Sequence, residues 1–197
     1  GGDLYSPVDQ IAPVELISSL AGSALQAAKK AVSDGCWAEA EGPAALALAL
    51  ATGIREIDLA LVKWGTQAAA KVATIDPGQP RLYRAVCVPP NAVKPGPALD
   101  GWLEPTASEL AWPLPPALHE VLCQLAPHGK PTIGAAVLPL RSLPVADRYY
   151  LWSVSQELAP EVGLAAGQVR LALGAELAQR FGAEVAQLVL ADSFSVS

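Results

Sequence analysis

Apolar positions recur with a helical period over the first quarter of the chain. Pro13 fits the first turn of a helix, where its missing N–H costs nothing. The pattern then continues through an alanine-rich stretch to about Asp34 and Gly35. A second helix is predicted over residues 39–51 and ends at Gly53, because glycine readily adopts the left-handed conformation that follows many helices.

A third helix is predicted directly after this glycine, over residues 54–64. One face of it would carry four apolar residues at helical spacing: Ile54, Ile57, Leu61 and Trp64. Arg55 and Asp58 fall at the edge of this apolar stripe. The sequence therefore places an arginine and a carboxylate beside a joint between two apolar helices.

The periodicity changes between residues 71 and 114. Residues 81–90 and 108–114 have the composition of strands, and a connection containing proline and glycine, which carries Lys94, separates them. Residues 115–125 return to a helical pattern with proline in the first turn.

Three further helices are predicted, over residues 146–158, 165–181 and 183–191. The order of elements is helices, a small sheet and more helices. We expect a single domain over residues 1–197, mainly α with a small antiparallel β-sheet, and we interpret Gly1 and Gly2 as a cloning scar.

Composition limits the classes of function. No apolar stretch approaches the roughly 20 residues that cross a bilayer, and no signal-peptide layout is visible, so we expect a cytoplasmic protein without a membrane partner. The formal net charge is -6, whereas nucleic-acid-binding domains are usually basic. A nucleic-acid site would have to use a local cluster among the 13 lysines and arginines.

The three cysteines, Cys36, Cys87 and Cys123, are odd in number and lack CxxC spacing, which argues against a disulfide framework and a zinc site. His119 and Cys123, four positions apart on one predicted helix, provide half of a metal site or a histidine beside a buried thiol at the edge of the core; the second reading is favoured. The aromatic run at residues 149–152 is suited to helix packing or to base stacking.

Three segments together carry a family resemblance. "LALATGIREIDLALVKW", residues 48–64, resembles the first signature box of the tyrosine recombinase (phage integrase) family, a Thr-Gly-Leu-Arg stretch with an acid three positions after the arginine. "LAWPLPPALHEVL" resembles that family's strand ending in Pro-Leu-Pro before a helix. Residues 163–192 resemble the second box, where His-x-x-Arg opens a helix and Leu-Gly-His ends the next. The resemblance covers about residues 11–192 and implies a recombinase catalytic-domain-like fold.

The resemblance implies a role for each matching residue. In this family a tyrosine attacks a DNA phosphodiester and forms a phosphotyrosyl intermediate without a metal or other cofactor. Arg55 and Arg170 would hold the phosphate, because guanidinium groups are planar, always protonated and able to grip two oxygens. Asp58 would orient Arg55. Lys94 would protonate the leaving oxygen, with Arg84 as an alternative that lies within a strand.

The chain also departs from the family pattern. Gly167 replaces the histidine of His-x-x-Arg, and Asp192 replaces the histidine of Leu-Gly-His, where a carboxylate would repel a phosphate. The four tyrosines all precede the second box, whereas the family's nucleophile follows it. We therefore expect this polypeptide not to cleave DNA by itself.

Three functions remain open. The favoured one is the DNA-binding catalytic-type domain of a recombinase or integrase, acting on double-stranded DNA as a homo-oligomer, with strand cleavage and rejoining in the full-length protein. A noncatalytic recombinase-like domain that binds DNA or regulates a partner is the second, motivated by Gly167 and Asp192. The third is a helical protein-interaction module, suggested by the net charge.

Overall fold

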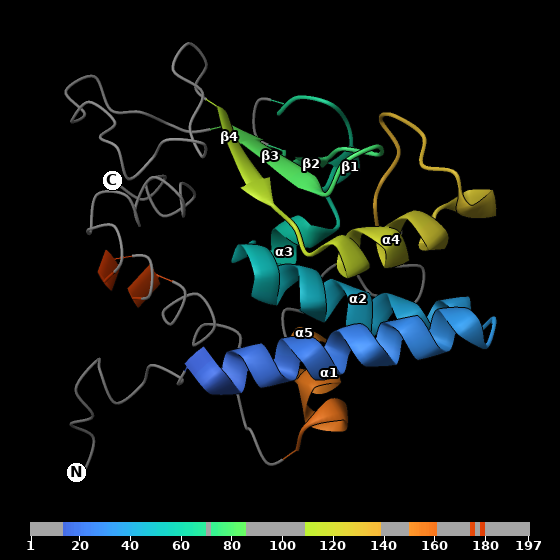
Figure 1. Cartoon of the computed structure of the whole chain (residues 1–197), viewed down its shortest axis with the longest axis vertical. Coiled ribbons are helices and arrows are strands. Elements are labelled where there is room, and N and C mark those ends of the chain that lie inside the picture. Colours follow the sequence, from blue (N-terminus) through green and yellow to red (C-terminus); the bar gives the residue numbers. More distant parts are fainter. Residues whose placement is uncertain are drawn as a thin grey trace.

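Two antiparallel helices joined by a tight turn form the base of the fold (Figure 1). The computed structural model describes residues 14–69, 72–85, 109–138, 150–160, 174–175 and 178–179. Helix α1 spans Val14–Ser33 and helix α2 spans Trp37–Thr52. Their contact is rich in alanine: Ala24 and Ala28 of α1 and Ala44 of α2 are fully buried. These small side chains let the two backbones pack closely.

The turn between α1 and α2 is closed by a glycine, as the sequence predicts. Gly35 has φ +74°, and its N–H donates to the Val32 carbonyl at 3.1 Å. The Cys36 N–H donates to the Ala31 carbonyl at 2.8 Å, which completes a Schellman motif. Two carbonyls at the end of α1 are thereby satisfied, and the chain reverses direction.

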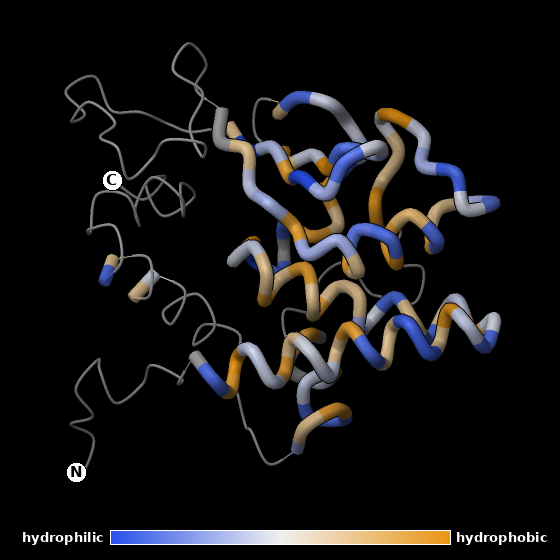
Figure 2. Tube along the Cα trace, in the orientation of Figure 1, coloured by the Kyte–Doolittle hydropathy of each residue, from blue (hydrophilic) through white to orange (hydrophobic). Residues whose placement is uncertain are grey.

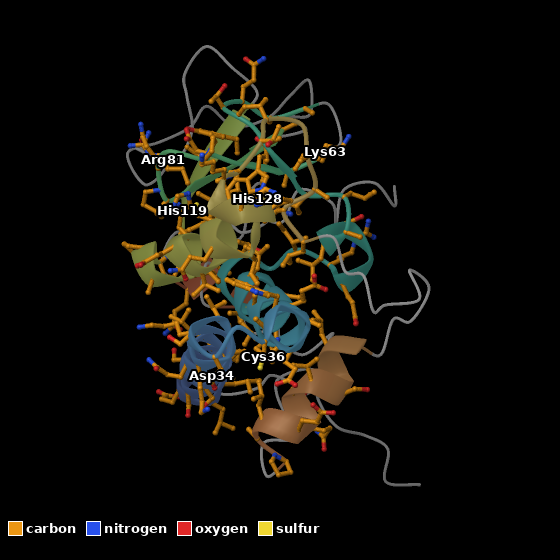
Figure 3. All side chains as sticks on the ribbon, turned by 90° about the vertical axis from the view of Figure 1, so that its right-hand side faces the viewer. Asp34, Cys36, Lys63, Arg81, His119 and His128 are labelled. Atoms are coloured by element: carbon orange, nitrogen blue, oxygen red, sulfur yellow. The ribbon has the colours of Figure 1, made fainter. Side chains whose placement is uncertain are left out.

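Helix α2 lies at the centre of the described fold. Figures 1 and 3 show α4 and the sheet on one side of it, and α1 and α5 on the other. Helix α4 spans Pro116–Leu125, as predicted, and α5 spans Tyr150–Leu158. Figure 2 shows mostly apolar residues along α2, whereas α1 alternates between polar and apolar positions. Eleven residues of α2 are buried, because neighbours cover it on several sides.

The predicted helix over residues 54–64 is wrong beyond its first turn. Only Glu56–Leu59 are helical (α3), and Lys63–Trp64 form strand β1. The Trp64 N–H donates to the Ala135 carbonyl at 2.9 Å, so a hydrogen bond to a distant segment removes Trp64 from the helix. Trp64 is buried by this route, while Leu61, expected on the same apolar face, is 51% exposed. Tertiary hydrogen bonds override the local pattern here.

The sheet has four short strands in the order β1-β2-β3-β4. Strand β2 spans Thr74–Ile75, β3 spans Arg81–Ala85 and β4 spans Glu109–Pro113. The predicted antiparallel pairing is confirmed for β3 with β4, where Tyr83 lies opposite Ala111, and β2 also pairs antiparallel with β3. Strands β1 and β2, which the sequence did not predict, run parallel because the chain crosses over between them, so the expectation of a purely antiparallel sheet is wrong. The sheet is therefore mixed.

The described residues thus make a mainly helical fold with a small mixed sheet. No helix among them is long and apolar enough to pass through a membrane. Residues 174–175 and 178–179 are helical, within the predicted helix 165–181. The predicted helix 183–191, residues 86–90 of the first predicted strand and residues 146–149 lie outside the described residues.

Candidate anion-binding site at the joint between α2 and α3

The joint that carries Arg55 is built by the end of α2. Gly53 adopts φ +70° and its N–H donates to the Ala49 carbonyl at 2.8 Å, which ends the helix as predicted. The buried Thr52 hydroxyl donates to the Leu48 carbonyl at 2.7 Å, and its oxygen accepts the Ile54 N–H at 3.3 Å. Because Thr52 and Ile54 are buried, the backbone on either side of Gly53 is anchored in the core.

Arg55 is the first residue of this joint that reaches solvent. Its backbone is extended, and its Nε donates to Asp58 Oδ2 at 2.9 Å. The Arg55 side chain is 48% exposed and the Asp58 side chain 33% exposed. The contact fixes the plane of the guanidinium. A charge-assisted hydrogen bond to a carboxylate is also what orients an arginine for a second anion.

The same geometry also has a purely structural reading. An exposed ion pair three positions apart on a helical turn contributes only a few tenths of a kcal/mol. Asp58 is the predicted partner of Arg55, and the structure brings these two together. The hydrogen bond alone therefore serves either role, so the surroundings of the joint matter.

A second arginine comes to the joint from the sheet. Arg84 of β3 donates from Nη1 to the Thr52 carbonyl at 3.2 Å, and Trp112 of β4 donates from Nε1 to the Ala51 carbonyl at 3.0 Å. Cationic and N–H donors are favourable at the carbonyl end of a helix. Two neighbouring strands thus cap α2, and Arg84 brings a second guanidinium to a carbonyl three residues before Arg55.

Glu56 ties the joint to a distant helix. Its Oε1 accepts the backbone N–H of Leu151, in the first turn of α5, at 2.6 Å. A carboxylate at a helix N-terminus satisfies an N–H that has no partner within the helix. Sequence reasoning missed this role, because the two residues are 95 positions apart and nothing local to Glu56 indicates the contact.

The remaining predicted site residues, Lys94, Gly167, Arg170 and Asp192, lie outside the described residues. The structure therefore places only Arg55 and Asp58 of the predicted set, together with the alternative candidate Arg84.

His119 and Cys123 attach α4 to the turn before β3. His119 Nε2 lies 2.6 Å from the Asp76 carbonyl oxygen, which can only accept, so this nitrogen carries the proton. Cys123 Sγ lies 3.9 Å from His119 Nδ1 and 3.9 Å from the Pro77 carbonyl oxygen. Burial, and next the charge of Glu120, raise the pKa of Cys123 above its usual value. A neutral thiol beside a histidine that is hydrogen-bonded to a backbone carbonyl favours the structural interpretation of this pair.

The described part of the chain holds no group of three histidine, cysteine, aspartate or glutamate side chains arranged to bind a metal ion. In the predicted aromatic run, Leu151 is buried in the core, which supports packing at that position, whereas Tyr149 lies outside the described residues.

Known proteins add no family assignment. No protein-family model, curated protein or solved structure matches this chain.

Proposed function

We propose that this chain is the DNA-binding, catalytic-type domain of a tyrosine recombinase or integrase, with Arg55 as a ligand of a backbone phosphate. The observation that carries the proposal is the presentation of Arg55. It follows a buried glycine joint, its plane is held by Asp58, and nearly half of its side chain reaches solvent. A mainly helical fold with a small sheet between the motif segments also supports it.

The proposed chemistry follows the family resemblance. Arg55 and Arg170 grip the phosphate and stabilise the charge that develops on its oxygens. The tyrosine hydroxyl loses its proton to solvent as its oxygen bonds to phosphorus, the bond between phosphorus and the leaving oxygen breaks, and Lys94 gives the leaving oxygen its proton. No metal or other cofactor is needed for this step. The four tyrosines of these 197 residues do not occupy the nucleophile's place, so cleavage would need a tyrosine from outside them.

A noncatalytic role is the second candidate. Gly167 can neither donate to a phosphate nor exchange a proton, and Asp192 adds a negative charge. In that role the domain, acting in the cytoplasm as a homo-oligomer on DNA, would bind DNA or regulate a partner recombinase. Trapping of a phosphotyrosyl-DNA adduct with a longer protein would exclude the noncatalytic reading.

The test is the salt dependence of duplex DNA binding, measured by fluorescence anisotropy. Each phosphate contact contributes about 0.9 to the slope of log K against log salt concentration. We expect the double variant Arg55→Ala/Arg170→Ala to weaken binding about tenfold or more and to reduce the slope by about 1 to 2. Arg55→Lys keeps the charge but loses the planar two-oxygen grip, so its slope should stay near that of the parent while affinity falls.

Lys30→Ala is the matched control. Lys30 is exposed and pairs with Asp34 at 2.8 Å. It belongs to α1, the helix that lies across α2 from the sheet (Figure 1). The Lys30→Ala substitution removes one positive charge far from the joint and should leave the DNA affinity nearly unchanged. If the double variant and the control behave alike, or if the parent chain does not bind duplex DNA, Arg55 is a structural residue and the interaction-module reading is favoured.

A further inference from the structure

A second site lies at the opposite end of α2 from Arg55. A cleft of about 740 Å³ opens between the ends of α1 and α4 and the start of α2. We call it the α1–α4 cleft. Trp37 begins α2 and Thr52 ends it, so the cleft and the joint are roughly 22 Å apart along the helix. The residues that line the α1–α4 cleft are Val32, Ser33, Trp37, Glu41, Gln124, Leu125, Ala126, Pro127, His128 and Gly129.

Trp37 supplies an aromatic wall. It is 52% exposed, although an indole of this size usually buries most of its surface. Apolar side chains from α1 and α4, Val32 and Leu125, line the same cleft. An exposed indole beside apolar walls suits a flat or apolar ligand body.

Glu41 supplies a carboxylate. It lies one helical turn after Trp37, so both residues are on the same face of α2. Glu41 is only 6% exposed, and it has interaction partners within the fold. A carboxylate held in a cleft with apolar walls interacts with an opposite charge more strongly than one in water, because the local dielectric constant is low.

His128 reaches the cleft from a turn that favours other residues. It has φ +57°, and Gly129 follows with φ +67°. Hydrogen bonds from Gly129 N to Ala126 O at 2.8 Å and from Lys130 N to Pro127 O at 3.1 Å close two overlapping turns. Glycine or asparagine is usual at such a position, whereas histidine is strained there. Figure 3 shows this face, with His128 on the side of α4 and Asp34 and Cys36 at the turn between α1 and α2.

We propose that the α1–α4 cleft binds a small organic cation, with an aromatic or apolar body against Trp37 and an ammonium or guanidinium group toward Glu41. The start of α2 carries about half a positive charge, which by itself would favour an anion. Against this, Glu41 brings a carboxylate to the cleft, and none of the lining residues that the structure describes is lysine or arginine. A half-exposed tryptophan adds cation–π attraction. This site is independent of the proposed DNA-binding function.

Three probes with one indole body and three charges test the proposal. Tryptamine is a cation, tryptophol is neutral and indole-3-acetate is an anion at pH 7. Isothermal titration calorimetry with the whole chain should give a Kd for tryptamine at least about tenfold below that for tryptophol, with indole-3-acetate weakest. Equal affinities for the three probes, or no binding of tryptamine at about 10 mM, would overturn the proposal.

Two variants locate the site. Trp37→Ala should weaken tryptamine binding about tenfold or more, and Glu41→Gln should bring the affinities of tryptamine and tryptophol together. Leu61→Ala is the control, because Leu61 is as exposed as Trp37 but does not line the cleft. If Glu41→Gln fails to fold, tryptamine binding by Trp37→Ala alone decides the proposal. Trp37 is half exposed, so its replacement should leave the fold intact. Unchanged tryptamine binding in Trp37→Ala would overturn the proposal.

Discussion

The hydroxyl of Tyr83 donates to Asp76 Oδ2 at 2.8 Å, and the Gly78 N–H donates to the other carboxylate oxygen at 2.8 Å. Asp76 is buried, whereas Tyr83 is half-buried. These bonds link β3 to the turn after β2, and the backbone carbonyl of the same Asp76 contacts His119 of α4. The carboxylate therefore organises the end of the sheet that faces α4.

Tyr83→Phe should lower the free energy of unfolding at pH 7 by about 1 kcal/mol, because a hydrogen bond to a charged acceptor is lost at a partly solvated site. Urea unfolding monitored by circular dichroism measures this loss. The pKa of Tyr83 is raised, first by burial and then by its hydrogen bond to Asp76.

The raised pKa of Tyr83 predicts how the difference in stability between the parent and Tyr83→Phe depends on pH. The stabilisation is fully present below the ordinary tyrosine pKa of about 10 and is lost as pH rises through the higher pKa of the folded state. The gap in stability between the parent and Tyr83→Phe should therefore narrow above about pH 10. A gap that stays constant from neutral to alkaline pH would show that the hydroxyl contributes nothing that depends on its proton.

Residue-scale contacts were predictable only where the partners are close in sequence. Arg55 and Asp58 lie three positions apart, so the motif and helix geometry both indicate their pairing. Arg84 was a candidate for its charge, but its contact with Thr52 spans 32 positions and depends on how the sheet sits over α2. Nothing in the sequence near Glu56 indicated its hydrogen bond to the Leu151 N–H, because the two residues are 95 positions apart.

At the scale of elements, the ends of helices were the most predictable features. The ends of three helices follow the expected signals, because the backbone preferences of glycine and proline act locally: Gly35 ends α1, Gly53 ends α2, and Pro115 and Pro116 start α4. The short strands β1 and β2 were not predicted. Each has two residues, and their pairing depends on segments that come later in the chain, such as Ala135 beside Trp64.

Gly53→Ala and Gly22→Ala should change stability in opposite directions. Gly53 has φ +70°, so a side chain there should cost about 1 kcal/mol. Gly22 lies inside α1 with open space around its Cα, so alanine should stabilise by about 0.5 to 1 kcal/mol. Thermal unfolding of both variants measures the two shifts. A Gly53→Ala variant as stable as the parent would contradict the role of the left-handed conformation, and a less stable Gly22→Ala variant would contradict the expected gain in α1.

At the scale of the whole molecule, one side chain links the joint to α5. Glu56→Ala removes the acceptor of the Leu151 N–H, so the first turn of α5 should open more often. Hydrogen–deuterium exchange at the Leu151 amide should accelerate about tenfold, corresponding to a loss of about 1.4 kcal/mol. Glu56→Gln keeps an acceptor oxygen and should show a smaller change. Equal exchange rates in the parent and both variants would contradict the link.

Helix α2 carries both proposed sites, one at each end, and packs in a core that contains buried alanines such as Ala28 of α1 and Ala44 and Ala45 of α2. A larger side chain at one of these alanines should displace helix α2 as a whole, because an overpacked core forces the backbone to move. In a mutational screen, variants that lose both DNA binding and tryptamine binding should therefore carry substitutions at these buried alanines. Variants that lose only one of the two activities should carry substitutions at the corresponding end of α2.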